Sequence, residues 1–390
     1  MRNAVIVEAV RTPIGKRNGF LSEIRAEELA AAPLQELIRR TNLDAALIDD
    51  VIMGCVTQTG EQAVNIARQA ALIAGYPVTV PGTTIDRQCG SSQQAIHFAA
   101  QAIISGDMDI VVAAGVESMS RVPMGSNHLG VKWNRALRDK YDMVHQGIAA
   151  AHIAKKWDIS RDEMNDYSFK SHQRARRAQE KGYFRQQMMP ISVKRADGTT
   201  AQFCQDEGPR KDTSMEKLAA LPDLFTRDSG ITAGNASQMS DGAAALLIMA
   251  EDKAKELELV PRFRILARSV IGSDPVEMLT GPIEATRQVL KKAGLAMKDM
   301  DVFEVNEAFA SIPLMWMKEI GAAEEKVNLD GGAIALGHPL GASGARLMVT
   351  MMHTMERLEA RFGLQTMCEG MGMANGTIIE RLPGVRRNFN

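Results

Sequence analysis

Cys89 stands in the segment TIDRQCGSSQQAI, residues 84–96, between a strand-like run and a small, polar helix start. The partial positive charge of a helix N-terminus stabilises a thiolate, which is the nucleophilic form of cysteine. Gly90 lets a substrate approach the backbone closely. Cys89 is therefore a candidate nucleophile. The alternative is a buried cysteine that serves only for packing.

His338 lies in a segment dense in glycine and small residues, GGAIALGHPLGASGA, residues 331–345. Gly337 and Pro339 hold this histidine in a sharp corner, which favours a role as a base or an oxyanion donor over that of a structural histidine. The segment lacks the G-x-G-x-x-G spacing of dinucleotide sites. The chain also has no phosphate-binding G-x-x-x-x-G-K-[ST] motif.

Two further segments place polar residues beside apolar strands. Asn306 follows an apolar run in VNEAFA, residues 305–310, although helix capping would also explain an asparagine there. The segment TMCEGMGMANGTIIE, residues 366–380, predicts a hairpin that begins at Cys368 and turns at its Asn-Gly dipeptide. Cys368 taken alone could be structural.

Strand and helix patterns alternate around these candidates. The runs AVIVEAV, DDVIMGCV and DIVVAAG predict three buried strands in the first third of the chain. Strands that alternate with helices predict a largely parallel sheet with helices on both faces. Such sheets place their sites at the carboxyl ends of strands, which suits the position of Cys89.

Helical spacing appears on both sides of the second of these strands. Residues 26–43 predict a helix that Pro33 should kink or interrupt. A second helix follows Cys89 and carries apolar residues at helical spacing. Gly106 is the expected end of that helix.

The first and last thirds of the chain resemble each other. LQELIRRTNLDAALIDDVIMG parallels TRQVLKKAGLAMKDMDVFEV at an offset of roughly 250 residues, and FRILARSVIG parallels AVIVEAVRTPIG. Each long segment has a helix that ends in a basic pair, then a short loop, an acidic residue and a buried strand. Between them lies a region of charged helices and polar loops. We predict an N-terminal half of residues 1–117 with 240–260, an inserted loop domain of residues 118–239, and a C-terminal half of residues 261–390.

The composition of the chain argues against several classes of function. The net charge of −1 gives no global field for nucleic acid or an anionic membrane, and 5% aromatic residues is too few for base-stacking platforms. The four cysteines form no CxxC pair, which argues against a disulfide framework or a metal site and fits a reducing compartment. No run of 18 apolar residues is present, and a strand pattern begins directly after the N-terminus. We expect a cytoplasmic protein without nucleic-acid or membrane partners.

Taken together, four segments resemble the thiolase family of acetyl-CoA acyltransferases and acetyltransferases. CGSS, TAGNASQMSDGAAA, NEAFA and GGAIALGHPLGASGAR occur in the family's order and spacing, and the match covers essentially the whole chain. The resemblance implies an α/β fold with a five-layered αβαβα core made of two similar halves. It also implies that the loop domain inserted in the first half covers CoA.

The resemblance also supplies catalytic roles. Cys89 resembles the nucleophile that takes the acyl group, and Cys368 the acid/base that moves a proton on the acetyl carbon or the CoA thiol. His338 would activate Cys89, and with a water held by Asn306 it would form one oxyanion hole. The backbone N–H groups of Cys89 and Gly370 would form the other.

Coenzyme A is implied as a substrate, with no permanently bound cofactor and no metal. Arg210 could attract the nucleotide phosphate, and Phe225 could cover the pantetheine. The family's CoA-lining positions fall on His145, Arg210, Phe225, Ala233, Ser237, Met278, Ala308 and Phe309. The resemblance further implies a homodimer or a homotetramer.

The implied reaction is cleavage of a 3-ketoacyl-CoA by CoA to acetyl-CoA and a shortened acyl-CoA, or the reverse condensation. Besides Met371, which stands where the family often has glycine, the chain departs from the family at two positions that bear on the reaction. Glu369 stands beside Cys368 where the family has an apolar residue, and it would disfavour the thiolate of Cys368 if it points inward. Gln146 stands where acetyl-specific members commonly have methionine, which indicates a deeper acyl pocket.

Three alternatives remain. A ketoacyl-synthase-like condensing enzyme would surround the nucleophile with two histidines or with histidine and asparagine, so the second cysteine, Cys368, argues against it. A non-catalytic CoA- or lipid-binding relative would be expected to lose one of the four motifs. A cysteine hydrolase would need neither Cys368 nor the CoA-lining residues.

Overall fold

The computed structural model describes residues 2–194 and 198–383, so the predicted halves and insertion are described except for residues 1, 195–197 and 384–390. The strands and helices of the first half, in chain order, are β1 (Ala4–Arg11), β2 (Gly15–Lys16), α1 (Ala26–Thr41), β3 (Asp50–Gly54), α2 (Ile66–Ile73), β4 (Gly82–Ile85), α3 (Ser91–Ser105), β5 (Ile110–Ser118) and, after the insertion, β8 (Ser240–Ala250) and α8 (Glu251–Glu256).

The second half repeats this alternation. Its strands and helices are β9 (Phe263–Gly272), α9 (Gly281–Ala293), β10 (Val302–Val305), α10 (Ser311–Ile320), α11 (Ala333–Leu336), α12 (Ser343–Arg357), β11 (Phe362–Glu369) and β12 (Met373–Arg381). The inserted region holds α4 (Arg135–Arg138), α5 (Gln146–Lys156), α6 (Arg161–Glu180), β6 (Ile191–Lys194), β7 (Thr200–Phe203) and α7 (Met215–Ala219).

The two halves share one pairing pattern, as the internal similarity predicts. The strand order is β10-β11-β12-β9-β1-β8-β5-β3-β4, so β3-β5-β8-β1 in the first half matches β10-β11-β12-β9 in the second. The matching segments also agree in detail, because α1 and α9 each end at a left-handed residue, Asn42 or Gly294, before a short 3-10 turn and the next strand. A short antiparallel pairing between β1 and β9 joins the two sheets.

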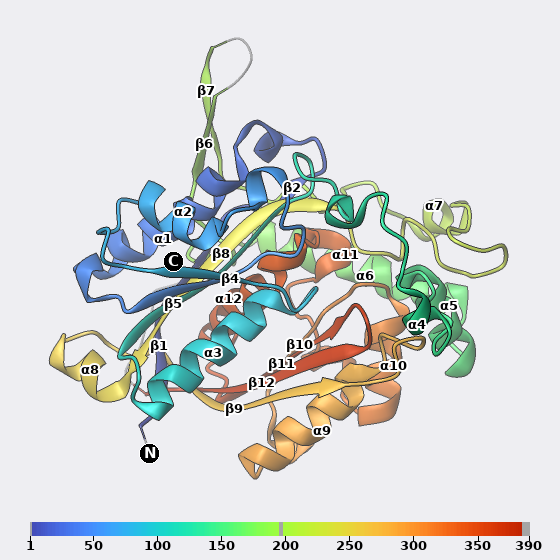
Figure 1. Cartoon of the computed structure of the whole chain (residues 1–390). Coiled ribbons are helices and arrows are strands. Elements are labelled where there is room, and N and C mark those ends of the chain that lie inside the picture. The colour runs from blue at the N-terminus through green and yellow to red at the C-terminus, as the bar shows by residue number, and fades with distance from the viewer. Residues whose placement is uncertain (1, 195–197, 384–390) are drawn as a thin grey trace.

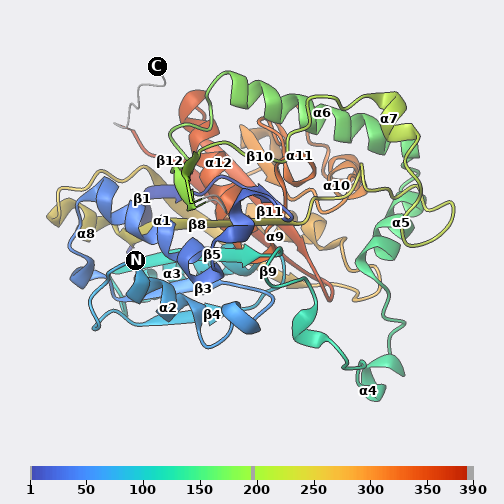
Figure 2. The ribbon, with the colours of Figure 1, turned by 90° about the horizontal axis from the view of Figure 1, so that it is seen from above.

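Helices cover these sheets in layers (Figures 1 and 2). The first layer, α1 and α2, packs on the outer face of the first half, and α9 packs on the outer face of the second half, with α10 against it. Helices α3 and α12 lie side by side between the two sheets and contact strands of both halves. This arrangement confirms the five-layered αβαβα core.

The prediction of a largely parallel sheet is wrong. Within the described residues, β3 pairs in parallel with β4 and β5, and β10 with β11, whereas β1, β8, β9 and β12 pair antiparallel with their neighbours. Parallel neighbours need a crossover connection, which α2 supplies between β3 and β4, α2 and α3 supply between β3 and β5, and α12 completes between β10 and β11. The strand β12 instead returns directly from β11 through a short turn, so these two strands must be antiparallel.

The helix that contains Pro33 is continuous, although an interruption or a kink was expected at this residue. Helix α1 runs from Ala26 to Thr41 with Pro33 inside it, although proline removes one backbone hydrogen bond. Its apolar face, which includes Leu29, Leu34 and Leu37, is fully buried. Most helical stability in proteins comes from packing of this kind, which here outweighs the lost hydrogen bond.

The hairpin at the end of the chain forms, but its turn lies elsewhere than predicted. Strands β11 and β12 pair from Phe362–Glu380 to Glu369–Met373, so the turn falls at residues 370–372 and the Asn-Gly dipeptide lies inside β12. A Cβ at Gly376 would lie 2.9 Å from the carbonyl oxygen of Ala285 in α9. Gly376 therefore permits the close approach of α9 to the sheet and does not form a turn.

The inserted region packs over one end of the core. Helix α6 contacts α11 and α7, and α5 packs against α10. The β6–β7 hairpin projects from the body of the molecule, and α4 lies on an extended excursion of the chain (Figures 1 and 2). The insertion thus brings α5 and α6 against the second half, where the VNEAFA segment lies.

Close contact between α3 and α12 sets the position of the catalytic candidates. A Cβ at Gly344 would lie 2.3 Å from the backbone nitrogen of Gln93, so only glycine lets these helices approach this closely. The Ser92 hydroxyl also accepts a hydrogen bond from the Ala345 N–H at 2.8 Å. The CGSS segment and the GASGA segment are therefore held together at the centre of the molecule.

Candidate active site

Cys89 lies in the connection from β4 to α3, four residues after the strand ends and two before the helix begins. The turn is shaped by Ser91, whose hydroxyl accepts from the Arg87 N–H at 2.9 Å and donates to the Gln88 carbonyl at 2.6 Å. Gln88 takes a left-handed conformation with φ of 48°, which a non-glycine residue adopts only under constraint. The turn presents the buried Cys89 at the N-terminal end of α3, as predicted.

His338 is buried in the corner between α11 and α12, and its hydrogen bonds define its tautomer. Nδ1 lies 2.6 Å from the Ser343 hydroxyl, and that hydroxyl donates to the Pro339 carbonyl at 2.9 Å. Because a hydroxyl has one proton, it must accept from His338, so Nδ1 carries the hydrogen. Nε2 is then unprotonated and faces the Asn306 amide nitrogen at 3.4 Å. The imidazole is therefore oriented as a base.

Asn306 joins His338 to Cys368. It directly follows β10, and its side chain lies near the Cys368 sulfur on the neighbouring strand β11, where it lowers the pKa of that thiol less than burial raises it. Its Oδ1 atom is buried and has no protein partner in the described chain, so it is available to accept from a water or a substrate. Asn306 is not a helix cap. The alternative explanation for this residue is therefore excluded.

Cys89 and Gly370 also meet. The N–H groups of Cys89 itself and of Gly370, in the turn after β11, lie near the Cys89 sulfur and lower the pKa of its thiol, although less than burial raises it. The two cysteines interact electrostatically, and Cys89 packs with Leu340 and Met367, which belong to the loops that carry His338 and Cys368. The structure therefore brings all five predicted catalytic candidates into one buried cluster.

The resting charge of this cluster differs from the prediction. Burial, with a smaller contribution from Glu369, raises the pKa of Cys89 to about 12, so the two backbone donors and the helix N-terminus do not hold it as a thiolate. Burial also raises the pKa of Cys368 well above its ordinary value. Burial lowers the pKa of His338 to about 3, so its imidazole is neutral. The site therefore rests with two thiols and a neutral base.

Two buried carboxylates hold the surrounding loops, and sequence reasoning missed their role. Glu117, at the end of β5, accepts from the N–H groups of Val56, Thr57 and Gly341 and from the amide of Gln62, all within 3.0 Å. It thereby fixes the loop that follows His338. Its only signal in the sequence is a charged residue near the end of an apolar strand.

Glu307 plays the same part for the VNEAFA segment. It accepts from Tyr167 and Ser171 of α6, from Asn328, and from the N–H of Ile334 in α11, all at 2.8–3.0 Å. One carboxylate thus ties the insertion to the segment beside Asn306. The functional candidates lie on short loops that these charges hold in place.

Several predicted CoA-lining residues also meet. His145 caps α5 and stacks on Phe225, with ring centroids 4.6 Å apart, and the Phe225 ring meets the edge of Phe309 at 6.2 Å. The Ser237 N–H donates to the Ala308 carbonyl at 2.9 Å. These residues come from the insertion and from the segment after β10. They form a partly exposed aromatic surface beside the cluster.

The remaining CoA-lining candidates are less closely joined. Met278 is buried in the same apolar cluster as Ala308, Phe309 and Cys368. Ala233 is exposed on the loop that precedes β8. Arg210 is exposed, with its N–H donated to His172 of α6 at 3.2 Å, and no described contact joins its side chain to the aromatic surface.

Both departures from the family border the cluster. A Cβ at Gly370 would lie 3.0 Å from the amide nitrogen of Gln146 and 2.9 Å from the amide oxygen of Gln88. Glu369 is fully buried and its side chain points inward, against Gly90. The polar groups of these side chains therefore lie next to the cysteines.

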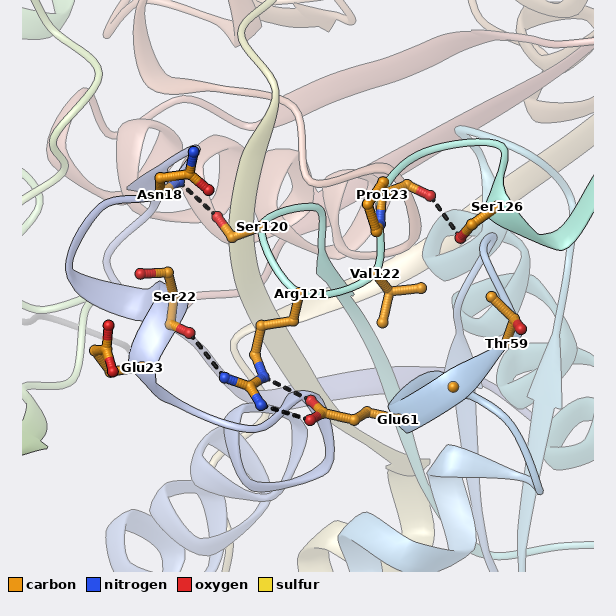
Figure 3. A pocket seen from close by; sticks show the side chains of 11 residues that line it. Asn18, Ser22, Glu23, Thr59, Glu61, Ser120, Arg121, Val122, Pro123 and Ser126 are labelled. Carbon is orange, nitrogen blue, oxygen red and sulfur yellow. Dashed lines mark hydrogen bonds and ion pairs between the residues drawn. The ribbon is translucent and has the colours of Figure 1, made fainter. Parts of the chain in front are cut away.

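A separate hollow of about 740 Å³ lies away from the cluster (Figure 3). It is lined by Asn18, Ser22, Glu23, Thr59, Gly60, Glu61, Ser120, Arg121, Val122, Pro123 and Ser126. The one arginine in its wall, Arg121, is paired with both carboxylate oxygens of Glu61 and with the Ser22 carbonyl. None of the predicted site residues lines this hollow.

Two other features are absent from the described residues. No group of three or more histidine, cysteine, aspartate or glutamate side chains is placed to hold a metal ion in residues 2–194 and 198–383. Within the same residues no helix has the length and apolar content needed to cross a membrane.

Comparison with known families identifies the family to which this fold belongs. The thiolase N-terminal domain matches residues 4–252, and the thiolase C-terminal domain matches residues 259–381. The chain therefore belongs to the thiolase family, and it is an acyltransferase.

Individual relatives agree with this assignment over nearly the whole chain. The steroid 3-ketoacyl-CoA thiolase FadA6 of Mycobacterium tuberculosis is 48% identical, covering 98% of this chain and 95% of the relative. A 3-ketoacyl-CoA thiolase of Pectobacterium carotovorum is 46% identical over 98% of this chain and 100% of its own length. The crystal structure of the Bacillus anthracis acetyl-CoA acetyltransferase superposes with a TM-score of 0.91 at 40% identity, covering 98% and 99% of the two chains.

Buried neutral histidines predict a loss of stability in acid. Burial lowers the pKa of His97 and His338 to about 3 and that of His172 to about 4. Below about pH 6.5 these histidines bind protons in the unfolded chain but not in the folded chain. The free energy of unfolding therefore falls as the pH drops from about 6.5 towards 4. Each histidine contributes about 1.4 kcal/mol per pH unit in that window. Urea unfolding at a series of pH values measures this slope.

His97→Gln provides the matched control, because glutamine can still meet the Thr377 hydroxyl that His97 contacts at 2.7 Å. The variant should lose about a third of the slope that these three histidines contribute. Equal slopes in the wild type and the variant would contradict the assignment.

Proposed function

We propose that this acyltransferase cleaves a 3-ketoacyl-CoA with CoA, through an acyl group carried on Cys89. The observation that supports this most is the single cluster of two cysteines, one histidine and one asparagine, with the backbone N–H groups of Cys89 and Gly370 beside the Cys89 sulfur. The reverse reaction, condensation of two acyl-CoAs, uses the same groups.

In the first half of the reaction, His338 Nε2 takes the proton of the Cys89 thiol as the sulfur attacks the 3-keto carbon. The pKa values of Cys89, about 12, and His338, about 3, make a resting thiolate–imidazolium pair unfavourable, so proton transfer must accompany attack on the substrate. The imidazolium that forms carries a hydrogen on Nε2. The His338 ring, which first acted as a base, can thereby donate a hydrogen bond to the oxyanion next to Asn306.

Collapse of the tetrahedral intermediate breaks the bond between the second and third acyl carbons. The electron pair leaves on the acetyl-CoA carbon, and Cys368 gives it a proton, so acetyl-CoA departs and the shortened acyl group stays on Cys89. In the second half the Cys368 thiolate takes the proton of an incoming CoA thiol, whose sulfur attacks the acyl group. The Cys89 sulfur then regains the proton from His338.

The N–H groups of Cys89 and Gly370 fit the negative charge that develops on the thioester oxygen. Removal of one such donor typically costs 10²- to 10³-fold in rate. These groups come from two different halves of the molecule, the β4–α3 turn and the turn after β11. Two acid/base groups near one nucleophile support a thiolase over a ketoacyl synthase, a hydrolase or a non-catalytic binder.

We also propose that residues 118–239 act as the domain that covers CoA. Support comes from His145 and Phe225 of that region, which lie against Phe309 beside the cluster. Phe225 is 44% exposed, so its ring offers a surface for the pantetheine. The exposed Arg210 has a charge suited to the nucleotide phosphate.

Cys89 and Cys368 should be distinguishable by the step of the reaction that each one supports. Incubation with an acyl-CoA should leave one acyl group on the peptide that contains Cys89, and Cys89→Ala should remove that adduct. Cys368→Ala should lower turnover by at least about 10²-fold, because no group remains to protonate the departing carbon, yet Cys89 should still be acylated. Peptide mass spectrometry and a thiolysis assay measure the two outcomes.

Cys204→Ala is the matched control, because this cysteine is exposed and outside the cluster. It should leave both the adduct and the turnover unchanged. An adduct that maps to Cys55 or Cys204, or that persists in Cys89→Ala, would mean that the nucleophile is wrongly assigned.

Gln146 should set the length of acyl chain that the enzyme accepts. Its amide lies beside Gly370, at the wall of the cluster, in the position where acetyl-specific members of the family commonly have methionine. We therefore expect thiolysis rates to remain high with chains longer than acetoacetyl, and Gln146→Met to lower kcat/KM selectively for those longer chains. Acetoacetyl-CoA is the internal control, and wild-type activity confined to it would contradict this proposal.

We propose a homo-oligomer, dimer or tetramer, in which a second copy extends the sheet. Strand β4 ends the strand order and leaves an edge without a partner in the described chain. Val64 and Val78, which are 87% and 79% exposed, lie in segments that hydrogen-bond around this edge.

Two active-site cysteines that must both stay reduced further support a reducing compartment such as the cytoplasm.

Val78→Lys should weaken self-association, because a charge beside the edge opposes pairing with an identical edge. Val260→Lys is the matched control, since this valine is also exposed, at 60%, but lies near the start of β9. Sedimentation velocity should give a multiple of the chain mass for the wild type and the control. A monomeric wild type would rule out the oligomer.

A further inference from the structure

Glu369 is a buried acid inside the catalytic cluster to which the proposed reaction assigns no role. It is the last residue of β11, between Cys368 and Gly370, and its side chain is completely shielded from solvent. Neither of its carboxyl oxygens has a hydrogen-bond partner in the described chain. A buried polar group without a partner is costly, so its retention calls for an explanation.

The side chain of Glu369 crosses from one half of the site to the other. A Cβ at Gly90 would lie 1.9 Å from its Oε1 atom, so the carboxyl group rests directly on the Gly90 Cα. Gly90 follows Cys89, and Glu369 precedes Gly370. The side chain therefore fills the space between the two segments whose N–H groups reach the Cys89 sulfur.

The surroundings favour an uncharged carboxyl group. The titratable groups that face it are Asp86, Arg87 and Cys89 from the turn before α3, and Cys368 from its own strand. Arg87 attracts a negative charge, Asp86 repels it, and no ion pair to Glu369 lies within the described residues. Burial outweighs both and raises the pKa of Glu369 well above its ordinary value.

We propose that Glu369, as an uncharged carboxylic acid, is a positioning residue that sets the spacing between the N–H groups of Cys89 and Gly370. A carboxylate in the same place would repel the negative charge that these N–H groups stabilise during reaction. Ionisation of Glu369 therefore lowers turnover. This inference rests on the proposed roles of Cys89 and Gly370.

Three forms of the enzyme test the proposal through kcat and the KM for CoA between about pH 6 and pH 10. Glu369→Gln keeps the size and the neutral state, so its kcat should stay within about threefold of the wild type at neutral pH and should lack a decline that the wild type shows in alkali. Glu369→Ala leaves a gap, so its kcat should fall by about 10²-fold with little change in the KM for CoA.

Two kinetic results would overturn the proposal. If Glu369→Gln loses as much activity as Glu369→Ala, the acid does more than hold space. If the wild type and Glu369→Gln share the same alkaline decline, ionisation of Glu369 is not its cause. Glu325→Gln, which makes the same change at an exposed position, should match the wild type throughout.

A measurement of stability separates this inference from the proposed function. An acid with a raised pKa in the folded chain favours unfolding as pH rises above about 4.3, the value in an unfolded chain. The Tm of Glu369→Gln relative to that of the wild type should therefore increase between about pH 5 and pH 8. A constant difference would refute the uncharged state whatever reaction the enzyme catalyses. An increase in a protein without thiolase activity would instead reject the proposed function alone.

Discussion

The close contact between α3 and α12 is the constraint on which the rest of the structure depends. Each helix begins at a catalytic segment, Cys89 before α3 and His338 before α12. Both helices lie between the two sheets, so their N-terminal ends are buried together. A side chain at Gly344 would push the helices apart and would separate Cys89, the proposed nucleophile, from His338, its proposed base. The repeated half-structure thus serves to bring two equivalent corners of the fold face to face.

The electrostatics of the site follow from this burial. Among the described residues no cation is paired with Cys89 or Cys368, and desolvation leaves both as thiols. The hydrogen-bond chain from His338 through Ser343 to Pro339 keeps one ring nitrogen protonated and frees the other. A neutral resting site avoids buried charges that have no partner. Negative charge develops only when the substrate supplies an oxygen that accepts hydrogen bonds from the donors of the site.

Much of this arrangement could be predicted from the sequence, because the residues that carry chemistry follow recognisable strand ends. Cys89, Asn306 and Cys368 each lie at or just beyond a strand end, and the glycines beside His338 mark a corner. The internal similarity likewise predicted two matching halves. These signals are local, so they can be read without knowing which segments meet.

The predictions that are wrong depend on partners far away in the chain. Pro33 is tolerated because the sheet packs against its helix, and Gly376 serves the approach of α9 and not a turn. The expected thiolate at Cys89 is not held, because burial outweighs the helix N-terminus. Local patterns cannot reveal the tautomer of His338 either, since Ser343 and Pro339 act through the folded corner.

The position of β8 in the sheet has a consequence for how the chain is made. This strand lies between β1 and β5, yet it follows the whole insertion in the sequence. During synthesis β1 and β5 therefore lack the strand that lies between them until residues 240–250 have left the ribosome. Apolar surface on these strands stays uncovered for that time. Pairings across such long separations form slowly and expose the chain to aggregation in the meantime. The topology that places β8 between β1 and β5 therefore makes this sheet depend on contacts that form late in the folding of the chain.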